Sequence, residues 1–244
     1  MRSLALNRLL IWPASAWCTT VLLGIAVPAV VLLTLWDGAS SPQALSSGPI
    51  FTLGLMGVGI IAAATAGRFG LAVVLALMNV AFLLLLALAL GMPVLTHPLS
   101  TALAMVIASV SFSARGALFS VTLAQRGWLM ALFVVAGEAS VLFIASVFPG
   151  TLPDWFLALL PAQWASIAIN VSLTATDMLA ALPVLIALAG TAVTTLLAAR
   201  FFLRRWPYPL MFTAWLGLSA LVYFYSTPTM PDAEPTFISA AETI

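Results

Sequence analysis

The stretch FPGTLPDWFLALLPAQWASIAIN, residues 148–170, decides how this chain divides between membrane and surface. It leaves a long apolar segment through Pro149 and Pro153. No charged residue lies between Asp154 and Asp177. By length alone the stretch could therefore cross a bilayer, and its pattern has to decide whether it does.

Polar side chains recur along one face of this stretch. Gln163, Ser166 and Asn170 are spaced i, i+3 and i+7, which is the spacing of one helical face. Tryptophan favours the membrane–water interface, and proline interrupts a straight helix. We therefore predict a helical hairpin over 153–170 that lies in, or dips into, the outer interface without crossing. The residues that define it are Pro149, Pro153, Trp155, Pro161, Gln163 and Asn170.

The composition of the whole chain is that of a membrane protein. Of 244 residues, 64% are hydrophobic and only 6% are charged, whereas a soluble surface needs roughly a quarter of its residues charged. Only helices and closed barrels satisfy their backbone groups in lipid. The apolar runs are too long for barrel strands of about 10 residues, so we predict an all-α polytopic membrane protein.

Seven apolar segments are long enough to cross the membrane. They are predicted at 14–36, 50–66, 71–92, 99–124, 128–148, 178–199 and 208–225. The clearest loop is 37–49, because Ser, Gly and Pro crowd it. Residues 1–226 are predicted to form a single transmembrane domain, and 227–244 a flexible acidic tail.

The arginines predict the orientation. With the N-terminus in the cytoplasm, every arginine outside the spans falls on the cytoplasmic side, as the positive-inside rule requires. These residues are Arg2, Arg8, Arg68, Arg126, Arg200, Arg204 and Arg205. Treating 153–170 as a full span would move the last three outside. The arginine bias thus predicts seven spans, an outer hairpin and an external C-terminus.

Two charges remain inside predicted spans, Arg115 and Glu138. Arg115 precedes the turn at Arg126 by 11 residues and Glu138 follows it by 12, which places both roughly 16–18 Å from the turn. Ionisable side chains at membrane depth face a partner or a water-filled cavity. Three interpretations are open. The two form a structural ion pair, they line a substrate or ion path, or the fourth span ends near Ser113 and leaves Arg115 at the interface.

Small and polar residues inside the spans suggest close helix packing. Asn79 is predicted to make an interhelical hydrogen bond. Four serines of the fourth span serve either packing or a polar translocation lining; they are Ser109, Ser111, Ser113 and Ser120. Glycines in or beside the second span suggest close backbone contact, with a subunit interface as one place for it; they are Gly54, Gly57, Gly59 and Gly67.

Several classes of chemistry are excluded by residue counts. All eight cations are arginines, so lysine nucleophiles and retinal Schiff bases are excluded. Cys18 and His97 are each the only residue of their kind, which leaves no intrachain disulfide and no Cys or His metal cluster. There is no nucleophile–base pair, phosphate loop or basic patch for nucleic acid. We predict no enzyme activity, cofactor or metal.

Residues 128–205 resemble the C-terminal half of ABC-2 type transporter permeases. Phe148-Pro149 ends an apolar span, Leu152-Pro153-Asp154-Trp155 follows, and Leu160-Pro161-Ala162-Gln163-Trp164 precedes a last core span closed by Arg204-Arg205. In that family the pattern Phe-Pro…Leu-Pro-x-Trp…Pro marks an extracellular re-entrant hairpin before the sixth helix. The resemblance implies a permease subunit in the bacterial cytoplasmic (inner) membrane, working as a homodimer or hetero-oligomer with a cytoplasmic ATPase subunit.

Two features depart from the family pattern. The family carries a longer cytoplasmic segment between its second and third spans, where a coupling helix meets the ATPase, and here only 66–70 stand there. This chain also has a seventh span. It has no Walker A motif, so ATP hydrolysis would require a partner. The alternative is a non-catalytic scaffold or accessory subunit of a larger membrane complex.

Overall fold

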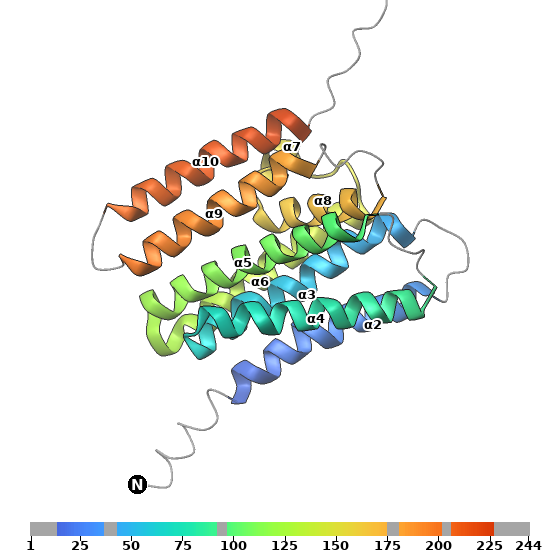
Figure 1. The fold of residues 1–244 in the computed structure, drawn as a ribbon, viewed down its shortest axis with the longest axis horizontal. Helices are drawn as coiled ribbons and strands as arrows, with labels where there is room; N and C mark the ends of the chain where they lie inside the picture. The colour runs from blue at the N-terminus through green and yellow to red at the C-terminus, as the bar shows by residue number, and fades with distance from the viewer. Residues whose placement is uncertain (1–13, 37–42, 92–96, 175–180, 202–205, 227–244) are drawn as a thin grey trace, which may run out of the picture.

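The computed structural model describes residues 14–36, 43–91, 97–174, 181–201 and 206–226 (Figure 1). These residues form helices and the turns that join them, with no strand among them. The first helix runs from residue 14 through a π-helical segment to residue 36. The named elements are η1 (Leu22–Ala26), α2 (Val27–Trp36), α3 (Gln43–Ala66), α4 (Phe69–Ala89), α5 (Pro98–Leu123), η2 (Ala124–Arg126), α6 (Gly127–Val147), α7 (Asp154–Leu157), α8 (Pro161–Thr174), α9 (Leu182–Arg200) and α10 (Pro207–Ser226). The segments 1–13 and 227–244, where a basic entry segment and an acidic tail are predicted, lie outside the described residues.

Six helical runs within the described residues are long and apolar enough to cross a membrane. One of them, Pro98–Val147, is 50 residues long and contains both α5 and α6. The chain reverses between these two helices at Ala124, which has a positive φ of 46°, and Figure 1 shows them running side by side. The predicted class is confirmed to this extent: the described residues are all-helical, and several of their helices are long and apolar enough to span a membrane.

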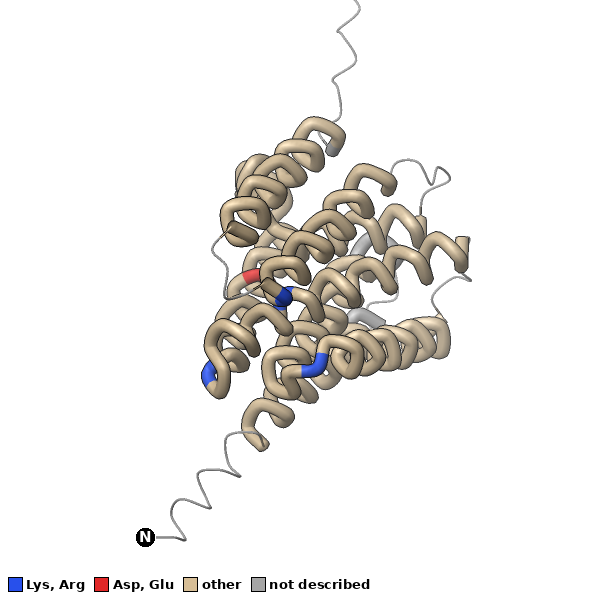
Figure 2. The backbone as a smooth tube through the Cα atoms, turned by 60° about the vertical axis from the view of Figure 1, so that its left-hand side comes forward, with Lys and Arg blue, Asp and Glu red and all other residues tan. Residues whose placement is uncertain are grey.

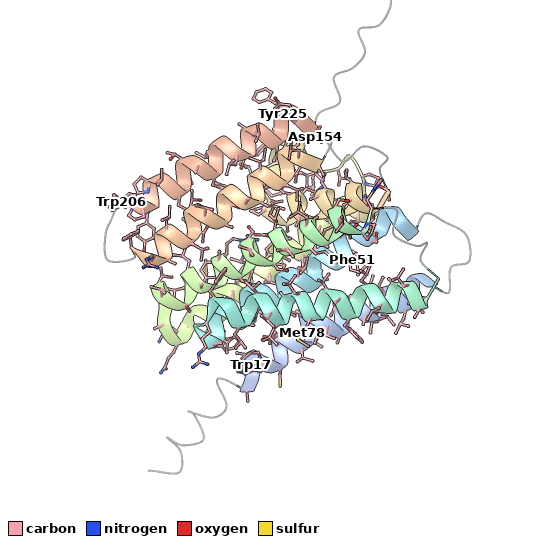
Figure 3. All side chains as sticks on the ribbon, in the orientation of Figure 1. Trp17, Phe51, Met78, Asp154, Trp206 and Tyr225 are labelled. Atoms are coloured by element: carbon pink, nitrogen blue, oxygen red, sulfur yellow. The ribbon has the colours of Figure 1, made fainter. Side chains whose placement is uncertain are left out.

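Helix α3 is the centre of the bundle. Within an apolar stretch of 18 residues in each helix, 78% are buried in α3 and 11% in α10. Figure 1 shows α3 among α4, α5 and α8, whereas α10 lies at the edge of the bundle beyond α9. Figure 3 shows Phe51 of α3 inside the bundle and Met78 of α4 on its outside; they are 0% and 67% exposed. An exterior of large apolar side chains suits lipid rather than water.

Pro28 shapes the first helix, and Asn79 compensates for it. Proline has no N–H, so the carbonyl oxygen of Gly24, four residues earlier, loses its usual α-helical donor. The helix widens into η1, where Val27 donates to the Leu22 carbonyl. From α4, the Asn79 amide donates to the Gly24 carbonyl at 2.8 Å and to the Gly54 carbonyl at 3.2 Å. The predicted interhelical hydrogen bond of Asn79 is confirmed.

Replacing this amide should weaken the bundle measurably. In Asn79→Leu the Gly24 carbonyl loses its donor, and we expect the free energy of unfolding to fall by about 0.6–1.7 kcal/mol, the range measured for interhelical hydrogen bonds in membranes. Thermal unfolding of the purified chain checks it. The control is Ser140→Ala, because Ser140 is exposed and bonds only to Ala136 of its own helix. Equal unfolding temperatures for the two variants would contradict the prediction.

Glycines let the first helix and α3 touch backbone to backbone. A Cβ on Gly57 would lie 2.8 Å from the Cα of Gly24, and a Cβ on Gly59 would lie 3.2 Å from the Cβ of Phe112 on α5. The close contact predicted for Gly54, Gly57 and Gly59 is therefore present within the chain, whereas nothing lies within 4 Å of a Cβ built at Gly67. Gly67 has a φ of +64° and ends α3, the position at which glycine is favoured.

The predicted loop at 37–49 is wrong in its second half. Helix α3 begins at Gln43 and carries Pro49 inside it. Tertiary packing holds this extra turn. A Cβ on Gly48 would lie 2.6 Å from the carbonyl oxygen of Ser166 on α8, so the backbones of α3 and α8 are in contact there. Residues 43–49 favour a turn by their local sequence, but the contact between α3 and α8 outweighs this preference.

Candidate functional site

The segment that follows α6 enters the bundle and leaves it on the same side. Ala162, near the start of α8, donates its N–H to Glu138, which lies midway along α6. Near the end of α8, the Ser172 carbonyl accepts from Thr101, in the first turn of α5. Helix α8 therefore runs from the middle of the bundle to the end where α5 begins. Its 14 residues span about 21 Å, less than the roughly 30 Å of a bilayer core.

Two positions were predicted for this hairpin, lying in the outer interface or dipping into it, and the burial of α8 favours the second. Trp164 is 0% exposed and donates from Nε1 to the Ala158 carbonyl at 2.8 Å. Ser166 is buried, and Asn170 approaches Gly48 of α3. The polar face thus points into the bundle, because α3 offers a glycine for close approach. Gln163 is half-buried, whereas Pro149, Pro153 and Trp155 are exposed at the outer part of the hairpin.

The structure brings Arg115 and Glu138 into direct contact. Arg115 Nη1 donates to Glu138 Oε1 at 2.5 Å and Nη2 to Oε2 at 3.4 Å. The side chains are 15% and 10% exposed, and the guanidinium lies 5.0 Å from the centre of the Phe112 ring. Helix α5 continues eight residues past Arg115 to Leu123, so the helix itself does not end near Ser113. Figure 2 shows how few other charges the described tube carries.

Glu138 also caps the start of α8. Its Oε2 accepts from the N–H of Ala162 at 3.1 Å. The first N–H groups of a helix have no partner within it, and a carboxylate there also meets the positive end of the helix dipole. One carboxylate therefore joins α5, α6 and α8. Pro161 occupies the first position of α8, where its missing N–H costs little.

Sequence reasoning missed this third partner, although a signal for it exists. Leu160 precedes α8, and its carbonyl accepts from Gln163 and Trp164, but a leucine side chain cannot cap a helix. A helix that starts inside an apolar bundle without a capping residue needs an acceptor from elsewhere in the chain. Glu138 is the only acidic residue within the long apolar helices that the structure describes.

The serines of α5 serve packing. Ser109 and Ser120 donate to carbonyls of their own helix, and Ser111 lies 3.3 Å from the Thr191 hydroxyl of α9. Ser113 is fully buried against α3, near Gly59. None of these four serines lines the cavity beside the ion pair, so the packing interpretation is favoured over a polar lining.

A cavity of about 350 Å³ lies beside the ion pair, between α5, α6, α9 and α10. Pro161 and the two residues before it contribute to its wall. Three threonines of α9 and the ion pair are its polar residues, and the other nine are apolar or aromatic. The lining residues are Arg115, Leu118, Phe119, Val134, Glu138, Leu159, Leu160, Pro161, Thr191, Thr194, Thr195, Met211, Phe212 and Trp215.

The candidate site combines one ion pair with a largely apolar cavity. Its two ionised groups neutralise each other, and among the described residues no group of three His, Cys, Asp or Glu side chains gathers as a metal site would require. No protein-family model, curated protein or solved structure matches the chain.

Proposed function

We propose that the chain is the transmembrane permease subunit of an ABC-2-like exporter, which forms the translocation path and is powered by a separate ATPase subunit. The observation that carries this proposal is the half-length helix α8, which starts inside the bundle on the Arg115–Glu138 pair. The hairpin of α7 and α8 stands between α6 and α9, the place in the chain where the resembling family has its re-entrant hairpin.

The proposed topology has seven spans, a re-entrant hairpin and a cytoplasmic N-terminus in the bacterial inner membrane. The six apolar runs correspond to seven long helices, because the run Pro98–Val147 contains both α5 and α6. Figure 1 shows the turn between α3 and α4, η2 and the end of α9 at one end of the bundle. The arginines at these points are Arg68, Arg126 and Arg200. Their clustering supports a cytoplasmic assignment for that end.

Cysteine labelling tests the orientation. Thr151 and Thr174, at either end of the hairpin, and Gln125, in η2, are exposed. Each is replaced by cysteine in a Cys18→Ser background, because Cys18 is itself exposed. An impermeant maleimide added to intact cells should label the first two positions, and Gln125→Cys only after the membrane is opened. Labelling of Thr174→Cys only from the cytoplasm would overturn both the hairpin and the proposed family.

A second candidate function, a non-catalytic scaffold of a larger membrane complex, is favoured by one observation. Helix α3 ends at Ala66 and α4 begins at Phe69, so only Gly67 and Arg68 separate them. A coupling helix has no room there. If the chain does bind an ATPase, the contact would have to lie on another cytoplasmic segment. Among the described residues, η2 is a segment that could provide it.

Purification with native partners separates the two functions. The tagged chain is expressed with its neighbouring genes and isolated in mild detergent. A permease should retain a soluble protein with a Walker A motif, G-x-x-x-x-G-K-[ST], and show ATP hydrolysis that is lost when the motif lysine is replaced. A photo-crosslinking residue at Gln125 should capture that protein, and one at Thr151 should not. Recovery of integral membrane subunits alone would support the scaffold.

A further inference from the structure

The cavity beside the ion pair has the size and lining of a ligand site. Pockets that hold small molecules measure about 300–1,000 Å³ and combine apolar walls with a few polar groups. This one measures about 350 Å³. A second cavity of about 280 Å³, between α2, α3 and α6, has no charged residue in its wall. The cavity at the ion pair is therefore the stronger candidate for selective binding.

Most polar groups of the wall already have a partner, although Arg115 Nε is buried without one. Arg115 and Glu138 pair, and Thr191 and Thr194 donate to the carbonyls of Leu188 and Gly190, both at 2.9 Å. A sugar, nucleotide or free ion would lose its hydration here and find few partners. An acyl chain dissolved in the bilayer has no hydration shell to lose on entering, and it makes packing contacts with the apolar wall.

Helices α6 and α10 both contribute side chains to the wall of the cavity. Phe212 of α10 lines it and is also 54% exposed, so it stands at the mouth, with Val134 of α6 contributing to the wall. Helix α10 rests on α9, where a Cβ on Gly190 would lie 2.8 Å from Leu218, and Figure 1 shows it at the edge of the bundle. Helix α10 is therefore an outer wall, and the mouth faces the apolar exterior.

The depth of the cavity puts a ligand headgroup near arginine. Its lining on α9 lies five to nine residues before Arg200, roughly 7–14 Å from that end of the helix. Arg200 is exposed there. The rings of Phe201 and Trp206 lie 5.8 Å apart at the same end, and tryptophan is typical of the level of lipid headgroups. An acyl chain in the cavity would thus leave its headgroup beside a cation, which favours an anionic one.

We infer that this cavity binds the acyl chain of an anionic membrane amphiphile that enters between α6 and α10 from the leaflet at the arginine end. The inference concerns binding by the chain itself. It stands or fails separately from the exporter proposal, because its test needs no ATPase and no transport.

Photo-labelling in a defined bilayer tests this inference. The full chain is placed in phosphatidylcholine nanodiscs with phosphatidylglycerol that carries a diazirine in its acyl chain, and adducts are mapped by mass spectrometry. We expect adducts on 115–119, 191–195 and 211–215 to exceed those on the exposed face of α4, at Met78 and Phe82, at least about tenfold, which corresponds to 1.4 kcal/mol. Unlabelled phosphatidylglycerol should compete at the cavity and not at α4.

Variants that fill the cavity complete the test. Val134→Trp should lower the cavity adducts about tenfold. Its control, Phe133→Trp, should leave them unchanged because the neighbouring Phe133 is 74% exposed. Thr194→Phe fills the same space from α9 and replaces Val134→Trp if that variant does not fold. Adducts spread evenly over α4 and the cavity, or insensitive to both fillings, would overturn the site. Equal labelling by a phosphatidylcholine probe would overturn the preference for an anionic headgroup.

Discussion

Glu138→Ala should destabilise the chain by about 3–5 kcal/mol, the usual cost of removing one partner of a buried ion pair. The variant leaves the guanidinium of Arg115 without its carboxylate and the N–H of Ala162 without its acceptor. The cost falls toward the lower end of this range if Arg115 reaches polar surroundings by snorkelling. Arg115→Ala should cost less, because the remaining carboxylate can protonate and still accept from Ala162.

Two double variants at Arg115 and Glu138 separate the effect of losing the ion pair from the effect of losing the acceptor that caps α8. Arg115→Met/Glu138→Leu removes both charges but leaves Ala162 unpaired, so it should recover part of the stability and retain a loss of about 1–3 kcal/mol. Arg115→Met/Glu138→Gln keeps an acceptor for Ala162 and should lie closest to the unmodified chain. Free energies of unfolding in detergent measure the series. Additive losses in the double-mutant cycle would show that the two side chains do not interact.

The same variants distinguish a clamp from a path residue. A structural clamp predicts that Arg115→Met/Glu138→Gln recovers transport together with stability. A residue of the translocation path predicts that stability returns and transport does not. The readout is export by the reconstituted complex with its ATPase, compared at equal amounts of folded protein.

Gly116→Ala should destabilise the chain by about 3 kcal/mol, the upper end of the usual range for overpacked cores. A Cβ at this position would collide with the Ile60 carbonyl oxygen and lie 2.7 Å from the Cβ of Ala63, both on α3. The main obstacle is backbone, which no rotamer change can move aside. Helices α3 and α5 would have to separate along the centre of the bundle. Thermal unfolding of the purified variant measures the loss.

The matched control is Gly137→Ala on α6. No atom lies within 4 Å of a Cβ built at Gly137, so the added methyl group meets no neighbour. Alanine is favoured over glycine inside a helix by about 0.5–1 kcal/mol, and this variant should be as stable as the original or slightly more so. If both alanine variants unfold at the same temperature, α3 and α5 are not in backbone contact at Gly116.

The sequence alone determined the class of the protein and the helices that make it up. Apolar length and sparse charge are local properties, and they identify membrane helices because lipid can satisfy neither charges nor open backbone. The predicted segments agree with α5, α6 and α10 to within one residue at each end. The pairing of Arg115 with Glu138 was also predictable, because both lie at similar distances from one short turn.

Only the tertiary structure decided where the polar face of α8 points and what Glu138 does there. The spacing of Gln163, Ser166 and Asn170 shows that they share a face, and it is the same whether that face meets water or another helix. The contact at Gly48 turns it inward and holds an extra turn of α3 against local preference. The bond from Ala162 to Glu138 joins residues 24 apart, and the wall that α10 adds to the cavity depends on how α10 packs on α9. These contacts link distant parts of the chain, so a local pattern can show that α8 lacks a capping residue but not which distant residue supplies the acceptor.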